Sequence, residues 1–379
     1  MKICIYSANY LPNIGGIEKF TERLSLQLRS MGHQVTIVTN NVFGLSDVEI
    51  LDGEIKVYRL PCFPLIAGRF PVPKKNARYK ELMNELFEQP VDGVLVNARF
   101  YPHSFIGVEH AERCGLKPVL IDHGSAYLTF GNSLLDLLVI AYEHAMTALL
   151  KRHQIDFYGI SNSSLRWLHT FQIDGLGVIN NSIDADDYLL EASTRSFAEE
   201  LDLDSDSLKV CFTGRLIPEK GIDELLGAAE LLKDDNVEFM IAGDGPLRKA
   251  AESRNPGNVH FLGRLPEEDI AALLGQCDIF CLPTRSEGFS TSLLEAAACY
   301  CTPVITNVGG VEEMIPSEEY GVVLSSQSSA LIARSLHDLG VDRERIRDIS
   351  KKIGKRVRCL FSWEQTANKV IQAFQRANN

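Results

Sequence analysis

Residues 208–221 read LKVCFTGRLIPEKG, and this stretch indicates most plainly which kind of fold the chain adopts. The apolar run Leu208–Thr213 is typical of a buried strand, because it is short, continuous and bounded by a glycine. Gly214, Pro218 and Gly221 shape the loop that follows, and a helical pattern begins directly after it. A strand, a glycine-containing loop and a helix in this order predict one unit of a parallel sheet that is covered by helices.

The same alternation extends towards both ends of the chain. Phe20, Leu24 and Leu28 recur at helical spacing, and Gly32 is placed to end that helix. Two successive open α/β sheets are therefore predicted, joined around residues 180–188, and ligands of such sheets bind outside the carboxyl ends of the strands. The expected strands are Ile3–Ser7, Val35–Thr39, Lys56–Leu60, Gly93–Val96, Val119–Asp122, Phe157–Ile160, Gly177–Ile179, Leu208–Thr213, Glu238–Ala242, Val259–Leu262, Ile279–Leu282 and Pro303–Thr306.

Composition narrows the class of protein. The chain has 379 residues, 45% apolar and 23% charged, which is typical of a globular protein of two domains or more. Its 38 basic and 50 acidic side chains give a net charge of −12, which argues against bulk nucleic-acid binding. The amino terminus lacks a signal-peptide pattern, so we expect a cytoplasmic protein. The apolar segment Leu134–Leu150 is interrupted by Asp136 and Glu143, and we expect it to be core, with a membrane surface as the alternative.

The nine cysteines are scattered and fit neither a secreted disulfide framework nor a zinc site. Cys277 and Cys281 form one close pair, and Cys299 and Cys301 form another, without a second cluster of possible ligands nearby. We expect buried free thiols and no metal site.

Two cations, Arg215 and Lys220, lie in the loop of the opening stretch, before a helix start. They suit a diphosphate, because guanidinium and ammonium groups donate charge-assisted hydrogen bonds to phosphate oxygens. Surface cations without a ligand are the alternative.

Residues 285–295, RSEGFSTSLLE, form the strongest candidate site. The backbone N–H groups of Ser290–Ser292 would be free at a helix start, where such groups bind phosphate. Glu287 on the loop and Glu295 two turns into the helix could accept hydrogen bonds from sugar hydroxyls. Two glutamates at this spacing are common by chance, so the turn and the helix start carry the interpretation.

Three weaker features lie where other expected strands end. Gly15 and Gly16 could admit an anion at a helix start or form a simple tight turn. In the turn Gly243–Arg248, the glycines suggest close approach of the backbone, with a simple strand-to-helix turn as the alternative. His123 follows the strand Val119–Asp122 and could contact a ligand or be a structural histidine.

Taken together, these motifs resemble those of glycosyltransferase family 4. The set is specific although no single member is, and the similarity covers nearly the full length. The residues that carry it are Gly15-Gly16, Gly214-Arg215-Leu216, Lys220-Gly221-Ile222, Gly243–Leu247, Phe261-Leu262-Gly263, Glu287-Gly288-Phe289, Glu295-Ala296, Pro303-Val304-Ile305, Gly309-Gly310 and Phe361-Ser362-Trp363.

The resemblance implies a GT-B fold, in which two Rossmann-like domains with parallel sheets face a central cleft. The implied domains are 1–182 for the acceptor, 183–360 for the nucleotide-sugar, and a helix, 361–379, that packs back on the N-terminal domain. Retaining transfer without an essential metal or cofactor is implied, with a UDP- or GDP-linked donor. Breaking the glycosyl–phosphate bond builds negative charge on the departing diphosphate, and fixed cations and amides stabilise it there. Same-face attack is implied, with the leaving phosphate taking the acceptor proton.

The resemblance also assigns roles. Arg215 and Lys220 would hold the diphosphate, and the amides of Ser290–Ser292 would meet the distal phosphate. Glu287 would bind sugar hydroxyls, Glu295 the ribose, and His123 the sugar near the reacting carbon. The expected catalytic residues are His123, Glu287, Arg215 and Lys220, and the expected donor-binding residues are Gly15, Gly16, Arg215, Lys220, Arg248, Arg264, Leu265, Glu287, Gly288, Phe289, Ser290, Thr291 and Glu295.

Three departures from the family pattern leave the donor sugar open. Ser290 stands where the family often has glycine, and Tyr300 precedes the Pro-Val-Ile strand where glycine is usual. The linker at residues 181–184 reads NSID rather than the usual NGID.

The acceptor side is expected in the first half, where residues 69–80, RFPVPKKNARYK, are rich in cations. Arg69, Lys74, Lys75 and Arg78 suit an anionic membrane surface or a pyrophosphate-linked lipid, and a solvated loop that opens a helix is the alternative. The basic stretch Arg343–Arg358 is expected to be a solvated helix face.

We therefore expect a retaining hexosyltransferase that uses a nucleotide-sugar and a glycan or lipid-linked acceptor. Surface polysaccharide, lipopolysaccharide or glycolipid biosynthesis is the expected context, with possible peripheral contact at the inner face of the cytoplasmic membrane. The alternatives are a nucleotide-sugar 2-epimerase and a non-catalytic nucleotide-sugar-binding subunit of a transferase complex.

Overall fold

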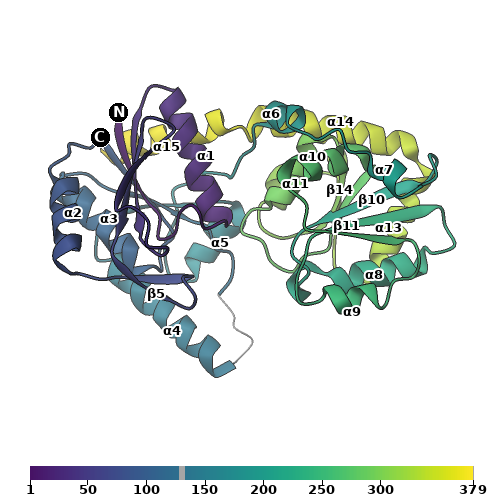
Figure 1. The fold of residues 1–379 in the computed structure, drawn as a ribbon, viewed down its shortest axis with the longest axis horizontal. Coiled ribbons are helices and arrows are strands. Elements are labelled where there is room, and N and C mark those ends of the chain that lie inside the picture. Colours follow the sequence, from purple (N-terminus) through teal and green to yellow (C-terminus); the bar gives the residue numbers. More distant parts are fainter. Residues whose placement is uncertain (128–132, 379) are drawn as a thin grey trace. The chain divides into compact units, whose positions relative to one another are not determined.

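The computed structural model describes residues 1–127 and 133–378, and the chain divides into two compact units (Figure 1). Unit 1 comprises Met1–Asn181 together with Trp363–Asn379, and unit 2 comprises Ser182–Ser362. The carboxyl-terminal helix thus belongs to the unit that the amino terminus begins. These divisions fall within two residues of the boundaries expected from the sequence.

Unit 1 is built on a seven-stranded sheet in the order β3-β4-β2-β1-β7-β8-β9. Its neighbours pair in parallel except β3, an edge strand that runs antiparallel to β4 and was not expected. The expected strand Gly177–Ile179 is wrong, because the segment pairs with β9 at one bridge only, between Val178 and Gly159. The strands are β1 (Lys2–Tyr6), β2 (Gln34–Asn40), β3 (Val48–Leu51), β4 (Ile55–Leu60), β7 (Gly93–Asn97), β8 (Val119–Asp122) and β9 (Asp156–Gly159).

Helices cover both faces of this sheet. Gly93 and Val96 of β7 point to opposite faces, because their separation along the strand is odd. Gly93 lies against Phe374 of the terminal helix, and Val96 lies against Gly107 of α3. Figure 1 shows that terminal helix, α15, beside α1. The helices are α1 (Gly16–Ser30), α2 (Ala77–Phe87), α3 (Pro102–Arg113), α4 (Ser133–Leu150), α5 (Asn162–His169) and α15 (Trp363–Ala377).

A two-stranded hairpin, β5 (Cys62–Leu65) and β6 (Phe70–Pro73), precedes α2. Neither strand was predicted from the sequence. Because Phe70–Pro73 form a strand, the alternative of a solvated loop that opens a helix is wrong for these residues. Phe70 packs its ring edge to face on Tyr142 of α4, with the ring centroids 5.5 Å apart, and this contact joins the hairpin to α4.

Helix α4 has an inverted distribution of polarity. Glu143 and Thr147 are buried and bind the guanidinium of Arg99 at 3.0 and 3.1 Å, while Leu134 and Leu137 are 71% and 61% exposed. The expectation that Leu134–Leu150 is core is therefore wrong for its first half. A buried cation draws the polar residues of the helix inwards, and the leucines on the opposite face point outwards.

Unit 2 contains a six-stranded parallel sheet in the order β12-β11-β10-β13-β14-β15, of which β15 was not expected. The carboxyl ends of all these strands therefore lie at one edge. The strands are β10 (Leu208–Thr213), β11 (Val237–Ala242), β12 (Val259–Gly263), β13 (Ile279–Leu282), β14 (Thr302–Thr306) and β15 (Val322–Leu324).

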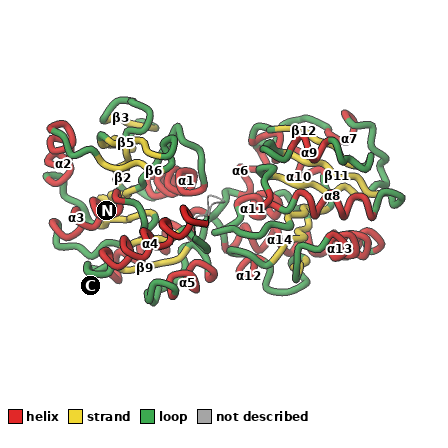
Figure 2. Tube along the Cα trace, turned by 90° about the horizontal axis from the view of Figure 1, so that it is seen from below, coloured by secondary structure: helices red, strands yellow, loops and turns green. Residues whose placement is uncertain are grey.

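The helices of unit 2 also lie on both sides of its sheet. In Figure 1, α8 and α9 lie on one side, and α10, α11 and α14 lie on the other; Figure 2 shows the same helices and strands after a turn of 90°. Among the helices that the structure describes, none combines the length and the apolar character that crossing a membrane requires. The helices are α6 (Ala185–Leu190), α7 (Phe197–Glu200), α8 (Ile222–Leu231), α9 (Arg248–Glu252), α10 (Glu267–Gln276), α11 (Thr291–Ala298), α12 (Val311–Met314), α13 (Ser329–Val341) and α14 (Arg343–Leu360), with a single 3₁₀ turn, η1 (Pro218–Lys220), before α8.

Candidate functional site

The candidate donor site of unit 2 centres on an ion pair between Lys220 and Glu287. Lys220 ends the 3₁₀ turn after β10, and Glu287 lies in the loop after the neighbouring strand β13. Both side chains are mostly buried, at 20% and 15% exposure, so each partner partly neutralises the other away from bulk water. The structure thus brings together two of the four catalytic residues expected from the sequence.

Backbone contacts fix the two loops against each other. Gly221 has a left-handed φ of 73°, and a Cβ at this position would collide with the carbonyl oxygen of Pro283. Thr284 donates its hydroxyl to the carbonyl of Glu219 at 3.0 Å. On the other side of the loop, a Cβ on Gly309 would lie 2.7 Å from the carbonyl oxygen of Glu287. The Glu287 loop is therefore held between two glycines, at positions where any side chain would collide with backbone.

Helix α11 presents its amino terminus directly after the Glu287 loop. Ser290 is the N-cap, and its hydroxyl accepts a hydrogen bond from the N–H of Leu293 at 3.3 Å. The N–H groups of Thr291 and Ser292 precede any helical acceptor and lie at the positive end of the helix dipole. Glu295 follows one turn later and is half-buried. An anion could bind at this helix start, with a carboxylate on either side.

The remaining donor-side residues of unit 2 lie on, or directly after, three loops that backbone hydrogen bonds connect. The N–H of Leu216 donates to the backbone carbonyl of Asp244 at 2.9 Å, and the N–H of Gly243 donates to the backbone carbonyl of Gly263 at 2.7 Å. Arg248 is held by Glu252 at 2.8 Å, and its acidic neighbours raise the pKa of the guanidinium. Arg215 and Arg264 are exposed, and Leu265 is half-buried, all at the edge where the strands end.

In unit 1, Gly15 caps α1 and Gly16 begins it, at the carboxyl end of β1. The side chain of Glu18 is buried beside them, where the amide of Asn13 donates to its Oε1 at 2.8 Å. Burial raises the pKa of Glu18. No role for Glu18 was predicted from the sequence, because its burial beside the glycines is set by the fold.

His123 lies at the carboxyl end of β8 in the same unit. Its Nε2 is 3.0 Å from Oδ1 of Asn97, the last residue of β7, and its ring packs on Phe20 of α1. Burial lowers the pKa of His123 to about 3, so its ring stays neutral. Asn97 was missed, because the expected strand ended at Val96; a polar residue directly after a buried strand was the available signal.

The cations expected on the acceptor side do not form one group. Arg78 pairs with Asp47 at 2.8 Å and with Glu81 at 3.1 Å, so acidic neighbours already hold it. Lys74 and Lys75 are exposed, and the ammonium of Lys74 lies 5.5 Å from the ring centroid of Phe63. Arg69 is exposed at the end of the hairpin loop.

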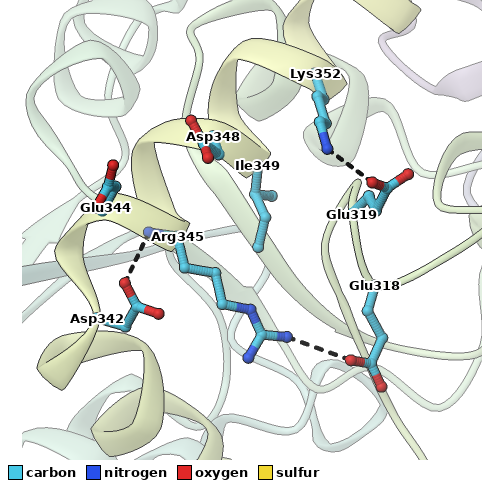
Figure 3. Close-up of a pocket in the computed structure, with 8 residues that line it drawn as sticks. All are labelled: Glu318, Glu319, Asp342, Glu344, Arg345, Asp348, Ile349 and Lys352. Carbon is cyan, nitrogen blue, oxygen red and sulfur yellow. Dashed lines mark hydrogen bonds and ion pairs between the residues drawn. The ribbon is translucent and has the colours of Figure 1, made fainter.

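A pocket of about 480 Å³ opens elsewhere on unit 2, beside the first turns of α14 (Figure 3). Arg345 binds Glu318 at 3.4 Å, and Lys352 binds Glu319 at 2.8 Å across it. Because carboxylates outnumber cations in its lining, the pocket would repel a diphosphate. The prediction that Arg343–Arg358 is a solvated helix face is confirmed by these exposed pairs. The lining residues are Glu318, Glu319, Asp342, Glu344, Arg345, Asp348, Ile349 and Lys352.

The cysteines are free, and those of the two close pairs are all buried. Cys211, on β10, lies among them with its Sγ 3.9 Å from that of Cys301. In the part of the chain that the structure describes, no three Cys, His, Asp or Glu side chains are grouped as a metal would require.

Comparisons with known proteins agree on one class. Residues 14–187 match the model described as Glycosyltransferase Family 4, and residues 193–358 match that of Glycosyl transferases group 1. The GPI3 subunit of phosphatidylinositol N-acetylglucosaminyltransferase from Saccharomyces cerevisiae is 25% identical, over 96% of this chain and 80% of that protein. A human protein, also named as a subunit of phosphatidylinositol N-acetylglucosaminyltransferase, is 26% identical, over 99% and 76%. An uncharacterized glycosyltransferase of Methanocaldococcus jannaschii is 25% identical, over 100% and 99%.

Solved structures agree on the fold. Sucrose-phosphate synthase from Thermosynechococcus elongatus superposes with a TM-score of 0.74 at 18% identity, covering 99% of this chain and 98% of that one. Anabaena HepE, solved in complex with UDP-glucose, gives a TM-score of 0.73 at 18% identity, covering 99% and 100%. The fold is therefore GT-B, with two Rossmann-like domains, as the sequence predicted.

Proposed function

Because the chain belongs to glycosyltransferase family 4, we propose that it transfers a hexose-type sugar from a nucleotide-sugar to a lipid-linked or glycan acceptor, with retention of configuration. The observation that carries this proposal is the Lys220–Glu287 pair beside the amino terminus of α11. In this place a cation, the backbone amides of a helix start and a carboxylate lie on loops that contact one another. A diphosphate that carries a sugar needs these three kinds of group together.

Lys220, Arg215 and the first amides of α11 would stabilise the charge that develops on the departing diphosphate. Glu287 would accept hydrogen bonds from the sugar hydroxyls when the diphosphate takes its place beside Lys220. Glu295 would bind the ribose, and His123 would contact the transferred sugar. With the diphosphate neutralised by protein groups, we propose that transfer needs neither a metal ion nor a cofactor.

The donor is proposed to be a UDP-sugar, with UDP-N-acetylglucosamine as the first candidate. Support comes from the names of the yeast and human relatives, which are N-acetylglucosaminyltransferase subunits, and from a structural neighbour solved with UDP-glucose. The same relatives act on phosphatidylinositol by name, which favours glycolipid synthesis over the polysaccharide and lipopolysaccharide contexts.

A lipid acceptor would place part of unit 1 against a membrane, and the outward face of α4 suits this role. Leu134, Leu135, Leu137 and Leu138 are exposed on α4, at 71%, 42%, 61% and 60%. The hairpin that Phe70 joins to α4 adds exposed Phe63, Leu65 and Ile66, together with the cations Arg69 and Lys74. Apolar side chains next to cations favour the interface of an anionic bilayer. We propose that this face, the leucine face, makes peripheral contact with the membrane at which the enzyme works.

The experiment that tests the function is product analysis with purified protein, a panel of nucleotide-sugars and a phosphatidylinositol-type acceptor. Transfer that persists in EDTA, with the donor's anomeric configuration in the product, is expected. Absence of transfer and of nucleotide release with every donor would contradict the proposal.

One alternative has a specific observation in its favour, since the yeast and human relatives are named as subunits. A non-catalytic nucleotide-sugar-binding subunit would bind the donor without turnover when purified alone. Turnover by this chain alone therefore separates the two functions.

A further inference from the structure

Three hydrogen bonds in unit 1 connect His123 to a backbone carbonyl of α1. His123 Nε2 lies 3.0 Å from Oδ1 of Asn97, and Nδ2 of Asn97 donates to Oγ1 of Thr21 at 3.0 Å. The Thr21 hydroxyl in turn donates to the carbonyl of Ile17 at 2.8 Å. Asn97 and Thr21 are buried, at 2% and 0% exposure, so water does not compete for these bonds.

The direction of each bond follows from the last member of the series. A backbone carbonyl can only accept, so the single hydroxyl proton of Thr21 points at Ile17. Oγ1 of Thr21 must then accept, which turns the NH₂ group of Asn97 towards it. The carbonyl oxygen of Asn97 therefore faces His123, and Nε2 of the ring must be the nitrogen that carries a proton. A flip of the Asn97 amide would turn its oxygen towards Oγ1 of Thr21, whose proton points at Ile17, so the bond between Asn97 and Thr21 would be lost.

We infer that Asn97 and Thr21 are positioning residues that hold His123 as the neutral tautomer protonated on Nε2, so that Nδ1 is presented as a hydrogen-bond acceptor. Such a nitrogen is matched to a hydroxyl of the transferred sugar and is mismatched to a phosphate oxygen. The identification of that hydroxyl rests on the proposed function, whereas the tautomer does not. The burial that lowers the pKa of His123 to about 3 agrees with a ring that never serves as a cation.

The packing around the ring supports a fixed orientation. Phe20 of α1 meets His123 edge to face, with ring centroids 5.0 Å apart, and Phe20 itself packs on Trp363 at 5.6 Å. The ring therefore has an aromatic wall from the same helix that supplies Thr21. Helix α1 thus fixes both where the ring lies and which of its nitrogens accepts.

The test is long-range ¹H–¹⁵N correlation spectroscopy of the intact protein labelled in histidine, which distinguishes the two neutral tautomers. The signals of His123 are identified by their loss in His123→Gln. We expect the Nε2-protonated pattern in the wild type, unchanged between pH 8 and pH 5. The Nδ1-protonated pattern, or a titration in this range, would overturn the inference.

Two matched pairs of variants test the chain of bonds. Asn97→Asp keeps an acceptor and should keep the tautomer, whereas Asn97→Leu removes it and should give a mixture. Thr21→Val keeps the shape but removes the hydroxyl, so it should also give a mixture, and Thr21→Ser should restore the wild-type pattern. Signals of His103 and His110, buried in the same unit, report that each variant is folded. A wild-type pattern in folded Asn97→Leu or Thr21→Val would refute the positioning role.

Kinetics separate this inference from the proposed function. Asn97→Leu should lower kcat on the order of tenfold while the affinity for UDP stays unchanged, since Arg215, Lys220 and Glu295, the proposed side-chain contacts of the nucleotide, lie in unit 2. If the tautomer shifts but kcat does not, Asn97 does position His123, and the proposed contact between His123 and the sugar is wrong. If the tautomer does not shift, the positioning role is wrong whatever the kinetics.

Discussion

At the scale of single residues, the pair of Lys220 and Glu287 predicts two opposite effects of one substitution. Glu287→Gln keeps the size of the side chain but removes the charge that now neutralises Lys220. UDP should bind at least as tightly as to the wild type, because the ammonium is released for phosphate. Transfer should fall by roughly a hundredfold, because the sugar loses a charged hydrogen-bond acceptor.

Both effects are measured on one preparation, by titration calorimetry with UDP and by a transfer assay. Glu295→Gln is the matched control. The expected partner of Glu295 is the ribose, so loss of its carboxylate should lower the affinity for UDP itself. If Glu287→Gln transferred sugar at the wild-type rate, the proposed contact between the Glu287 carboxylate and the sugar would be wrong.

Single residues also show which parts of the candidate site could be predicted from the sequence and which could not. Arg215, Lys220 and Glu287 were predicted as site residues because each lies on a glycine-shaped loop after an apolar run, which is a local signal. Asn97 carried a local signal too, as a polar residue directly after a buried strand, but its contacts with Thr21 and His123 could not be predicted, because both lie far from it in sequence. Such contacts are defined by which side chains meet in the fold.

At the scale of elements, α11 depends on its cap. Ser290→Ala removes the acceptor for the N–H of Leu293 and should lower the free energy of unfolding of unit 2 by about 1 kcal/mol. Ser290→Asp restores a cap and should restore that stability, but it adds a negative charge where phosphate is proposed to bind.

Urea unfolding followed by circular dichroism measures the first effect, and UDP titration measures the second. Tryptophan fluorescence is the internal control, because Trp167 and Trp363 both lie in unit 1. Equal UDP affinities for Ser290→Ala and Ser290→Asp would argue against an anion site at this helix start.

The leucine face of α4 predicts a membrane-binding defect without loss of fold. Leu137→Ser combined with Leu138→Ser should lower partition into anionic vesicles at least about tenfold, because exposed apolar area is lost. Lys74→Ala with Lys75→Ala should weaken binding to anionic vesicles and leave binding to neutral vesicles unchanged.

Sedimentation with vesicles checks both expectations, with Leu231→Ser, an equally exposed leucine of unit 2, as the control. Unchanged sedimentation of the α4 variant would show that the leucine face does not bind the membrane. A wild-type dimer in solution that the same variant dissociates would identify a second copy as the occupant instead.

Elements show the same limit of prediction. Most strands of both sheets were predicted close to their observed bounds, because a buried parallel strand is a continuous apolar run, whereas β3 and β15 were not predicted. The hairpin Cys62–Pro73 was missed, since Pro64, Pro71 and Pro73 argue against strands in general and fit only an isolated ribbon. The orientation of α4 was mispredicted because Arg99, the partner of Glu143, lies far away in sequence.

At the scale of the whole molecule, buried histidines make unit 1 sensitive to acid. Burial lowers the pKa of both His103 and His110 to about 4, below the value near 6.5 in an unfolded chain. The stability that their neutral forms contribute is complete above pH 6.5 and is lost as the pH falls towards 4. At pH 5, each contributes a loss of about 2 kcal/mol relative to pH 7.5. The raised pKa values of Glu18 and Asp122 act in the opposite direction, since the native state holds those protons more readily.

His103→Gln isolates one of these contributions, because glutamine can still donate to the carbonyl of Val38 that His103 now contacts at 2.9 Å. The difference in unfolding free energy between pH 7.5 and pH 5 should shrink by about 2 kcal/mol. Urea unfolding followed by tryptophan fluorescence measures this difference for unit 1 alone. A pH dependence identical to that of the wild type would show that His103 is not the group responsible.

The most direct test of the account is calorimetric titration of UDP into the wild type and into Arg215→Ala combined with Lys220→Ala. Arg285→Ala is the matched control, because this exposed cation of the Glu287 loop already pairs with Glu224. We predict one UDP site in the wild type and the control, and an affinity lower by roughly a hundredfold in the double variant. UDP binding of equal strength by all three proteins would contradict the proposal that these cations hold the diphosphate.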